Sequence, residues 1–197
     1  IPVTPTRVGL NDLGARLKSL PFTPLGSEML NDQLANHLRL GPHAVLLVRL
    51  AGNENAVNAQ VDAAREWGDC ANVNDAVWDA LRTADNPSIG SWRWSQLPSQ
   101  FGDAWTAADG ASRALDTFFL HGNPARGVVR VVALAPKAHV SLVVRAATAF
   151  KGTVALERLP ADVWPLVSPT AADPLARAIR DKFNPSRILN PGIMGTE

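Results

Sequence analysis

Residues 89–96 of this 197-residue chain read Ile-Gly-Ser-Trp-Arg-Trp-Ser-Gln, a stretch in which polar and aromatic side chains alternate. Successive side chains of a β-strand point to opposite faces of a sheet. The alternation therefore predicts a strand that presents its two serines and Arg93 on one face and Trp92 and Trp94 on the other. We expect the tryptophans to be buried against a helix, which leaves the opposite face of the sheet polar.

Downstream of this strand, the sequence predicts a hairpin, a helix and a further strand. Two strand-like runs, at about 113–120 and 127–134, flank residues 121–126, whose Gly, Asn and Pro favour a turn. A proline then opens a predicted helix over 136–149. A Lys-Gly turn separates this helix from a predicted strand over 153–158.

Upstream, residues 44–50 form a short apolar run that suits a buried strand better than a helix. Residues 54–67 follow with apolar side chains at helical spacing. Ser27 is the predicted N-cap of a helix over 28–40, because leucines recur there on one helical face. Residues 98–110 are ambiguous and admit a helix.

Strand–helix–strand order occurs twice, with the hairpin between the two halves. This is the split βαβ pattern of ferredoxin-like α+β domains. We expect a mostly antiparallel sheet with helices on one face. One domain spans residues 1–197, with a core over about 25–160 and a C-terminal helix and tail over 173–197. Asn184 ends that helix, because a residue before proline is pushed out of the α region.

Composition excludes several classes of protein. The chain has 19 Lys and Arg against 18 Asp and Glu, a net charge of +1, and no basic block, so it lacks the charge pattern of a nucleic-acid or membrane-surface binder. Its single cysteine, Cys70, cannot form an internal disulfide, and no apolar run approaches the about 20 residues of a membrane span. We expect a cytoplasmic domain. The chain starts at Ile1 without a signal peptide, and we interpret it as part of a longer protein.

The C-terminal end carries the most specific motif. Residues 179–194 read Ile-Arg-Asp-Lys-Phe-Asn-Pro-Ser-Arg-Ile-Leu-Asn-Pro-Gly-Ile-Met, which resembles the terminal signature of FAD-linked oxidases. In that family a helix ending in Lys-x-x-Phe-Asp-Pro is followed closely by Asn-Pro-Gly. Here Asn184 replaces the usual Asp, and Ile193 stands where the family commonly has Arg or Lys.

Three further segments, residues 77–82, 91–98 and 152–160, resemble parts of the FAD-binding subunits of glycolate oxidases, in the same order. The resemblance implies the C-terminal cap, or substrate, domain of a flavoprotein of the vanillyl-alcohol-oxidase type, with a ferredoxin-like sheet. It also implies oxidation of a small 2-hydroxy acid, such as glycolate or D-lactate, to the 2-oxo acid. The α-hydrogen would pass as a hydride to FAD, and the hydroxyl proton to a base.

The same resemblance implies where the cofactor is held. The family binds FAD mainly through a Gly/Ser-rich loop in an N-terminal domain, and this chain has no such loop, so we expect the chain alone to be inactive. The turn Asn190-Pro191-Gly192 is placed by the resemblance near the cofactor; a simple chain-terminating turn is the other interpretation. The implied partners are the FAD-binding domain, a homologous catalytic subunit and an iron–sulfur subunit.

The hairpin is the place where relatives carry catalytic chemistry. Relatives acting on D-lactate or D-2-hydroxyglutarate have a His-x-Gly-Asp-Gly-Asn-x-His motif there, whose histidines help to hold a divalent metal. Residues 121–130 of this chain lack the Asp, and Arg130 stands where the second His would be, so we expect no metal. His121 remains a candidate general base for the substrate hydroxyl, although a lone histidine at a turn is often only a solvated residue.

Arginines are the candidates for binding the substrate carboxylate without a metal, because a guanidinium binds a carboxylate through two parallel hydrogen bonds. Arg93, Arg130 and Arg158 each lie in a predicted strand. The alternative is that they form ion pairs on the open face of the sheet. The altered hairpin motif also suits a non-catalytic structural subunit of a glycolate-oxidase-type complex, and a free-standing ferredoxin-like ligand-binding domain is a third possibility.

Overall fold

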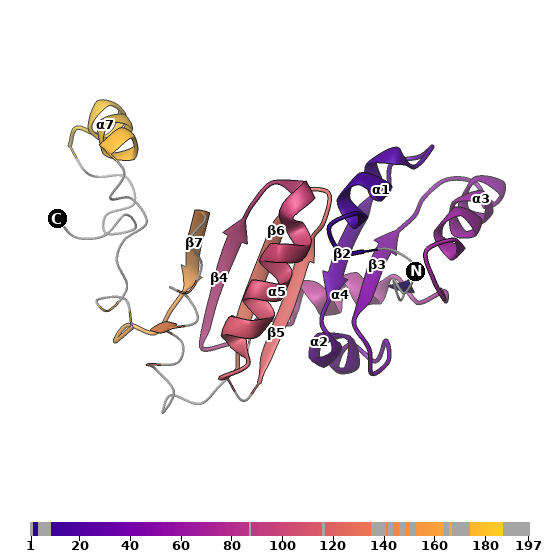
Figure 1. Ribbon diagram of the computed structural model, residues 1–197, viewed down its shortest axis with the longest axis horizontal. Coiled ribbons are helices and arrows are strands. Elements are labelled where there is room, and N and C mark those ends of the chain that lie inside the picture. Colours follow the sequence, from indigo (N-terminus) through magenta and orange to yellow (C-terminus); the bar gives the residue numbers. More distant parts are fainter. Residues whose placement is uncertain are drawn as a thin grey trace.

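The computed structural model describes residues 2–3, 9–86, 88–115, 117–134, 141, 144–145, 149, 153–163, 166 and 174–186. Its strands lie in one sheet (Figure 1). They are β1 (Pro2–Val3), β2 (Gly26–Leu30), β3 (Val45–Arg49), β4 (Gly90–Ser95), β5 (Phe118–Asn123), β6 (Val128–Ala133) and β7 (Thr153–Arg158). The helices are α1 (Leu13–Ser19), α2 (Asp32–His37), α3 (Glu54–Arg65), α4 (Ala76–Thr83), the short 3-10 helix η1 (Pro98–Gln100), α5 (Phe101–Ser112) and α7 (Pro174–Phe183).

The described strands pair antiparallel in the order β1-β3-β2-β5-β6-β4-β7. The predicted α+β class with an antiparallel sheet is confirmed. Strands β4 and β5 lie on either side of β6, and β6 and β7 lie on either side of β4, which is the split βαβ arrangement. The motif starts at β4, with α5 as its first helix, and not at residues 44–50 as predicted. Strand β3, formed by those residues, pairs with β2, which joins it to β5.

Helices pack on both faces of this sheet, which corrects the expectation of a single covered face. One buried cluster joins Trp92 to Phe101 of α5. A second joins Phe119 to Leu34 of α2 and Val77 of α4. The physical reason is visible in β3, which is buried at its first four positions and therefore needs apolar cover on both sides. Figure 1 shows α5 lying across β4, β5 and β6.

The helix predicted over 28–40 is wrong in its first part, because residues 26–30 form β2. Helix α2 starts only at Asp32, and its N-cap is Asn31, whose side chain accepts a hydrogen bond from the backbone N–H of Leu34 at 3.1 Å. Ser27 therefore lies in a strand and caps nothing. The three leucines that suggested one helical face are divided: Leu30 belongs to β2, Leu34 to α2, and Leu38 is the C-cap of α2.

The other predicted elements have mixed outcomes. The strands over 44–50, 89–96, 127–134 and 153–158 are confirmed as β3, β4, β6 and β7, and the C-terminal helix is confirmed as α7. The ambiguous residues 98–110 form η1 and most of α5. The first hairpin strand begins at Phe118 and continues to Asn123, so the turn is shorter than expected. Most of the helix predicted over 136–149 lies outside the described residues.

The tryptophans behave as the alternation predicted. The side chains of Trp92 and Trp94 are 0% and 1% exposed, whereas Arg93 between them is exposed. This face of β4 therefore belongs to the core, and the opposite face carries the polar residues. Among the described helices, none combines the length and the apolar character that crossing a membrane requires.

Candidate functional site

The polar face of the sheet brings His121, Arg130 and Arg93 into one row. In the sheet register His121 is directly opposite Arg130, and Arg130 is directly opposite Arg93. Residues that oppose each other in antiparallel strands project their side chains to the same face, within contact distance. Of the three arginines predicted to bind substrate, Arg130 therefore lies beside the predicted base, and Arg93 lies one strand further away on the same face.

Glu157 of β7 bridges the two arginines. Its Oε2 lies 2.6 Å from Nε of Arg130, and its Oε1 accepts a hydrogen bond from Nη2 of Arg130 at 2.9 Å, which makes the pair bidentate. Its Oε1 is also 3.9 Å from Nε of Arg93. Two guanidinium groups thus share one carboxylate. The two arginine side chains stay accessible, at 36% exposed for Arg130 and 46% for Arg93.

The charge state of Arg130 follows from these contacts. Partial burial lowers the pKa of Arg130, but its hydrogen bond and ion pair with Glu157, helped by the charges of Asp85 and Glu28, raise the pKa above its ordinary value on balance. Arg130 is therefore a permanent cation at the site.

His121 lies in strand β5, not in the hairpin turn where the sequence suggested it. The turn occupies residues 124–127, three residues further on. The side chain of His121 is only 15% exposed, and its Nδ1 lies 2.7 Å from Oε1 of Glu28 in β2. The interpretation as a solvated turn histidine is therefore wrong, because strand pairing holds the ring inside a polar cluster.

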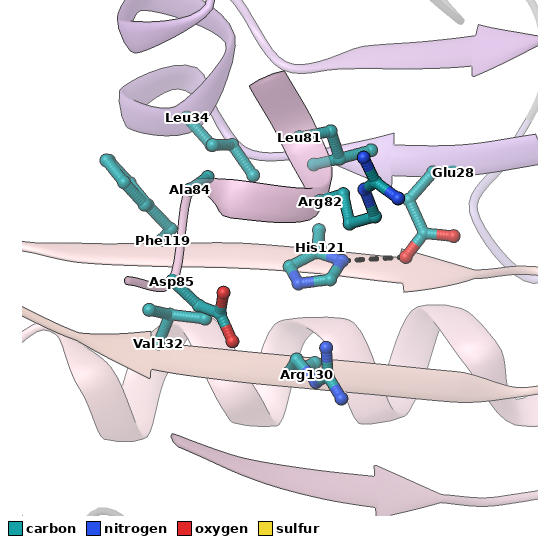
Figure 2. Close-up of a pocket in the computed structure, with 10 residues that line it drawn as sticks. All are labelled: Glu28, Leu34, Leu81, Arg82, Ala84, Asp85, Phe119, His121, Arg130 and Val132. Carbon is teal, nitrogen blue, oxygen red and sulfur yellow. Dashed lines mark hydrogen bonds and ion pairs between the residues drawn. The ribbon is translucent and has the colours of Figure 1, made fainter. Parts of the chain in front are cut away.

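A cavity of about 150 Å³ opens beside His121 and Arg130. Figure 2 shows the His121 ring among Glu28, Asp85 and Arg130. The charged and polar lining residues are Glu28, Arg82, Asp85, His121 and Arg130, and the apolar ones are Leu34, Leu81, Ala84, Phe119 and Val132. The cavity therefore combines two guanidinium groups, two carboxylates, an imidazole and apolar side chains around a volume that suits a small molecule.

Arg158 does not join this group. Its Nη1 donates to the backbone carbonyl oxygen of Asp85 at 3.0 Å and to Oγ of Ser88 at 3.2 Å. The register between β4 and β7 shifts by one residue between Ser91 and Trp92. Arg158 is opposite Ser91, so this shift lies between it and the pairing of Arg93. Arg158 thus holds the segment after α4 and reaches the cavity only through Asp85. The turn Asn190-Pro191-Gly192 lies outside the described residues.

Sequence reasoning missed the three carboxylates around these cations, Glu28, Asp85 and Glu157, as site residues. Glu28 lay in a segment predicted as helix, so its relation to His121, 93 positions away, was hidden. The alternation of β7 carried a usable signal, because it places Glu157 on the same face as Ala155, which is opposite Arg93.

The cavity beside His121 is not a site for FAD. A cavity of about 150 Å³ is well below the roughly 300–1,000 Å³ of pockets for larger organic ligands, and neither this cavity nor the described loops offer a Gly-rich phosphate cradle. The predicted cofactor contacts at 190–192 are not among these residues. In the part of the chain that the structure describes, no three His, Cys, Asp or Glu side chains gather as metal ligands would.

Comparisons of the chain with models of protein families, with curated proteins and with solved structures found no match. Its function must therefore be inferred from its own residues and their geometry.

Proposed function

We propose that this chain is the substrate-binding cap domain of a FAD-dependent enzyme that oxidises a small 2-hydroxy acid, such as glycolate or D-lactate, to the 2-oxo acid. The observation that carries the proposal is the register of His121 opposite Arg130 at the edge of one small cavity. A 2-hydroxy acid has a carboxylate next to a hydroxyl, so its recognition needs a cation next to a base. The resemblance of residues 179–194 to FAD-linked oxidases supports the same proposal.

The carboxylate would be bound by Arg130, which lines the cavity, with support from Arg93, which lies on the next strand and is not part of the lining. Arg93 and Arg130 oppose each other across β4 and β6, an arrangement that is unfavourable for like charges unless an anion separates them. Glu157 satisfies Arg130, whereas the Nη groups of Arg93 have no hydrogen-bond partner among the described residues. Among the described residues, Glu157 is thus the carboxylate in ion-pair contact with both arginines, and a substrate carboxylate would be a second partner.

The hydroxyl would face His121. Its Nε2 has no hydrogen-bond partner among the described residues, and the ring lines the cavity. In its neutral form an imidazole accepts a proton through the nitrogen that carries none. His121 would therefore take the proton of the substrate hydroxyl, acting as a general base.

The apolar wall would restrict the size of the substrate. Phe119 and Val132 from the sheet and Leu81 from α4 are apolar residues of the cavity lining. The cavity beside His121 is too small for FAD, so the proposal assigns the cofactor to a separate domain, as the resemblance implies. The contribution of this chain is to bind the carboxylate, orient the hydroxyl and remove its proton.

The experiment that tests the proposal starts with the protein made from the complete reading frame. We expect the purified protein to contain FAD and to be bleached by glycolate or D-lactate in the absence of an acceptor. Arg130→Gln and His121→Gln should each slow the bleaching strongly. Arg113→Gln removes an exposed arginine that pairs with Asp109 on α5, so it should react at the normal rate. A purified protein without flavin would overturn the proposal.

A non-catalytic structural subunit is the second candidate, and one observation favours it. Both oxygens of Glu157 are bound by Arg130, so this ion pair is complete without any ligand. In that case the sheet face would only be stabilised by its charges, and a homologous subunit would perform the reaction. Replacing Arg93, His121 and Arg130 together by Ala distinguishes the two candidates, because unchanged turnover of the assembled complex would support the structural role.

A further inference from the structure

We propose that Glu28 is the positioning residue of His121: it holds the imidazole in the tautomer that leaves Nε2 free to accept a proton at the cavity. The catalytic consequence rests on the proposed function, whereas the tautomer itself does not. Sequence reasoning did not connect the two residues, which lie in strands β2 and β5.

The contact itself determines which ring nitrogen carries the proton. Oε1 of Glu28 lies 2.7 Å from Nδ1 of His121. An ionised carboxylate only accepts hydrogen bonds, so Nδ1–H must be the donor. In the neutral ring Nε2 then has a free lone pair. Figure 2 shows Nδ1 turned towards Glu28, while the rest of the ring faces Asp85 and Arg130.

Glu28 is held on both sides by the pairing of its strand. On one side Glu28 is opposite Leu47 in the register between β2 and β3. On the other side β5 holds the neighbours of Glu28: Met29 is opposite Gly122, and the carbonyl oxygen of Ser27 accepts a hydrogen bond from Nδ2 of Asn123 at 3.0 Å. The Glu28 side chain is 21% exposed, so it projects from a fixed backbone into a partly desolvated cluster. A carboxylate fixed in this way orients a histidine better than a mobile surface residue would.

The other charged groups around the ring do not replace Glu28. Arg130 is opposite His121 in β6, but a guanidinium only donates hydrogen bonds, and Nη2 of Arg130 already donates to Glu157. The carboxylate of Asp85 lines the same cavity without a hydrogen bond to His121, and Arg82 pairs with Asp79 at 3.1 Å. Among the described residues, the ring of His121 therefore has one hydrogen-bond partner, Glu28.

The direct test is the tautomer of His121 in the whole chain. The sequence has four histidines, so ¹⁵N labelling of histidine gives few ring signals, and His121→Gln identifies those of His121. We expect the wild-type ring, in its neutral form, to be protonated at Nδ1. Glu28→Gln keeps the size of the side chain but removes the charge, and it should produce a mixture of tautomers. Glu66→Gln, which removes an exposed glutamate after α3, should leave the His121 signals unchanged.

Turnover supplies the second measurement. In the flavin-containing protein, Glu28→Gln should lower kcat by about 10- to 100-fold with little change in KM, because a misplaced tautomer weakens proton transfer and not substrate binding. A wild-type ring protonated at Nε2, a Glu28→Gln ring that keeps the Nδ1–H tautomer, or an unchanged kcat despite an altered tautomer would each overturn the inference. Absence of flavin would overturn the proposed function only, since the tautomer can still be measured.

Discussion

Asn31 and Leu120 are joined by two hydrogen bonds, one of which uses a side chain where a strand would use its backbone. The N–H of Asn31 donates to the carbonyl oxygen of Leu120 at 2.8 Å, and the N–H of Leu120 donates to Oδ1 of Asn31 at 3.2 Å. The backbone carbonyl of Asn31 is not free for this contact, because it accepts from Ala35 in α2. One residue thus ends β2, starts α2 and fixes β5 immediately before His121.

Asn31→Ala is therefore expected to destabilise the protein by about 2–4 kcal/mol. The change removes a helix cap, worth about 1 kcal/mol, and leaves the buried N–H of Leu120 without its partner, at a further cost of about 1–3 kcal/mol. Urea unfolding measures the difference. Asn53→Ala is the matched control, because Asn53 caps only the exposed start of α3 and should cost about 1 kcal/mol. Equal losses for both variants would contradict the double role of Asn31.

Gly122 and Gly110 are expected to respond to alanine with opposite signs. A Cβ on Gly122 would overlap the carbonyl oxygen of Val128 and lie 3.1 Å from Cε2 of Phe101, so Gly122→Ala should cost more than about 2 kcal/mol. A Cβ on Gly110 meets nothing within 4 Å, and the residue lies inside α5. Gly110→Ala should therefore stabilise the fold by about 0.5–1 kcal/mol. Thermal unfolding of both variants checks the signs, and a stable Gly122→Ala protein would refute the close packing of β5 on β6.

Glu157→Gln separates the two candidate functions. The ion pair with Arg130 is partly exposed, so its loss should cost only about 0.5–1 kcal/mol of stability. In the catalytic interpretation, the variant removes the carboxylate that contacts both Arg130 and Arg93, so glycolate should bind several-fold more tightly. Isothermal titration calorimetry of the wild type and the variant measures this change. In the structural interpretation neither protein binds the acid.

The contribution of Arg130 to stability should not vary with pH near neutrality. Contact with Glu157 raises the pKa of Arg130 despite its partial burial. A group whose pKa is raised by folding stabilises the fold at every pH below its pKa in the unfolded chain. This contribution is lost only as the pH rises through the pKa of the group in the folded protein. For arginine both pKa values lie far above neutral pH. The loss of unfolding free energy caused by Arg130→Gln, measured with urea, should therefore be the same at about pH 6 and pH 9. A loss that becomes smaller from pH 6 to pH 9 would show that another group titrates with Arg130.

Local sequence patterns predicted much of the fold. The alternation over 89–96 predicted the strand, its buried tryptophans and the polar face that holds Arg93, because a strand exposes alternate residues whatever surrounds it. The helix that ends at Phe183 was predictable from Pro185, since the proline ring acts on the residue before it. Both effects act between residues that are close in the chain, so they can be predicted from one sequence alone.

The site depended on contacts between distant residues. Leucines at positions 30 and 34 fit one helical stripe, and only the pairing of residues 26–30 with β3 and β5 makes the first of them part of a strand. That pairing also brings Glu28 to His121. The sequence by itself therefore determined the α+β class and several of the candidate residues. The tertiary structure decided which of them meet, because hydrogen bonds between strands join residues whose separation in the chain leaves no local pattern.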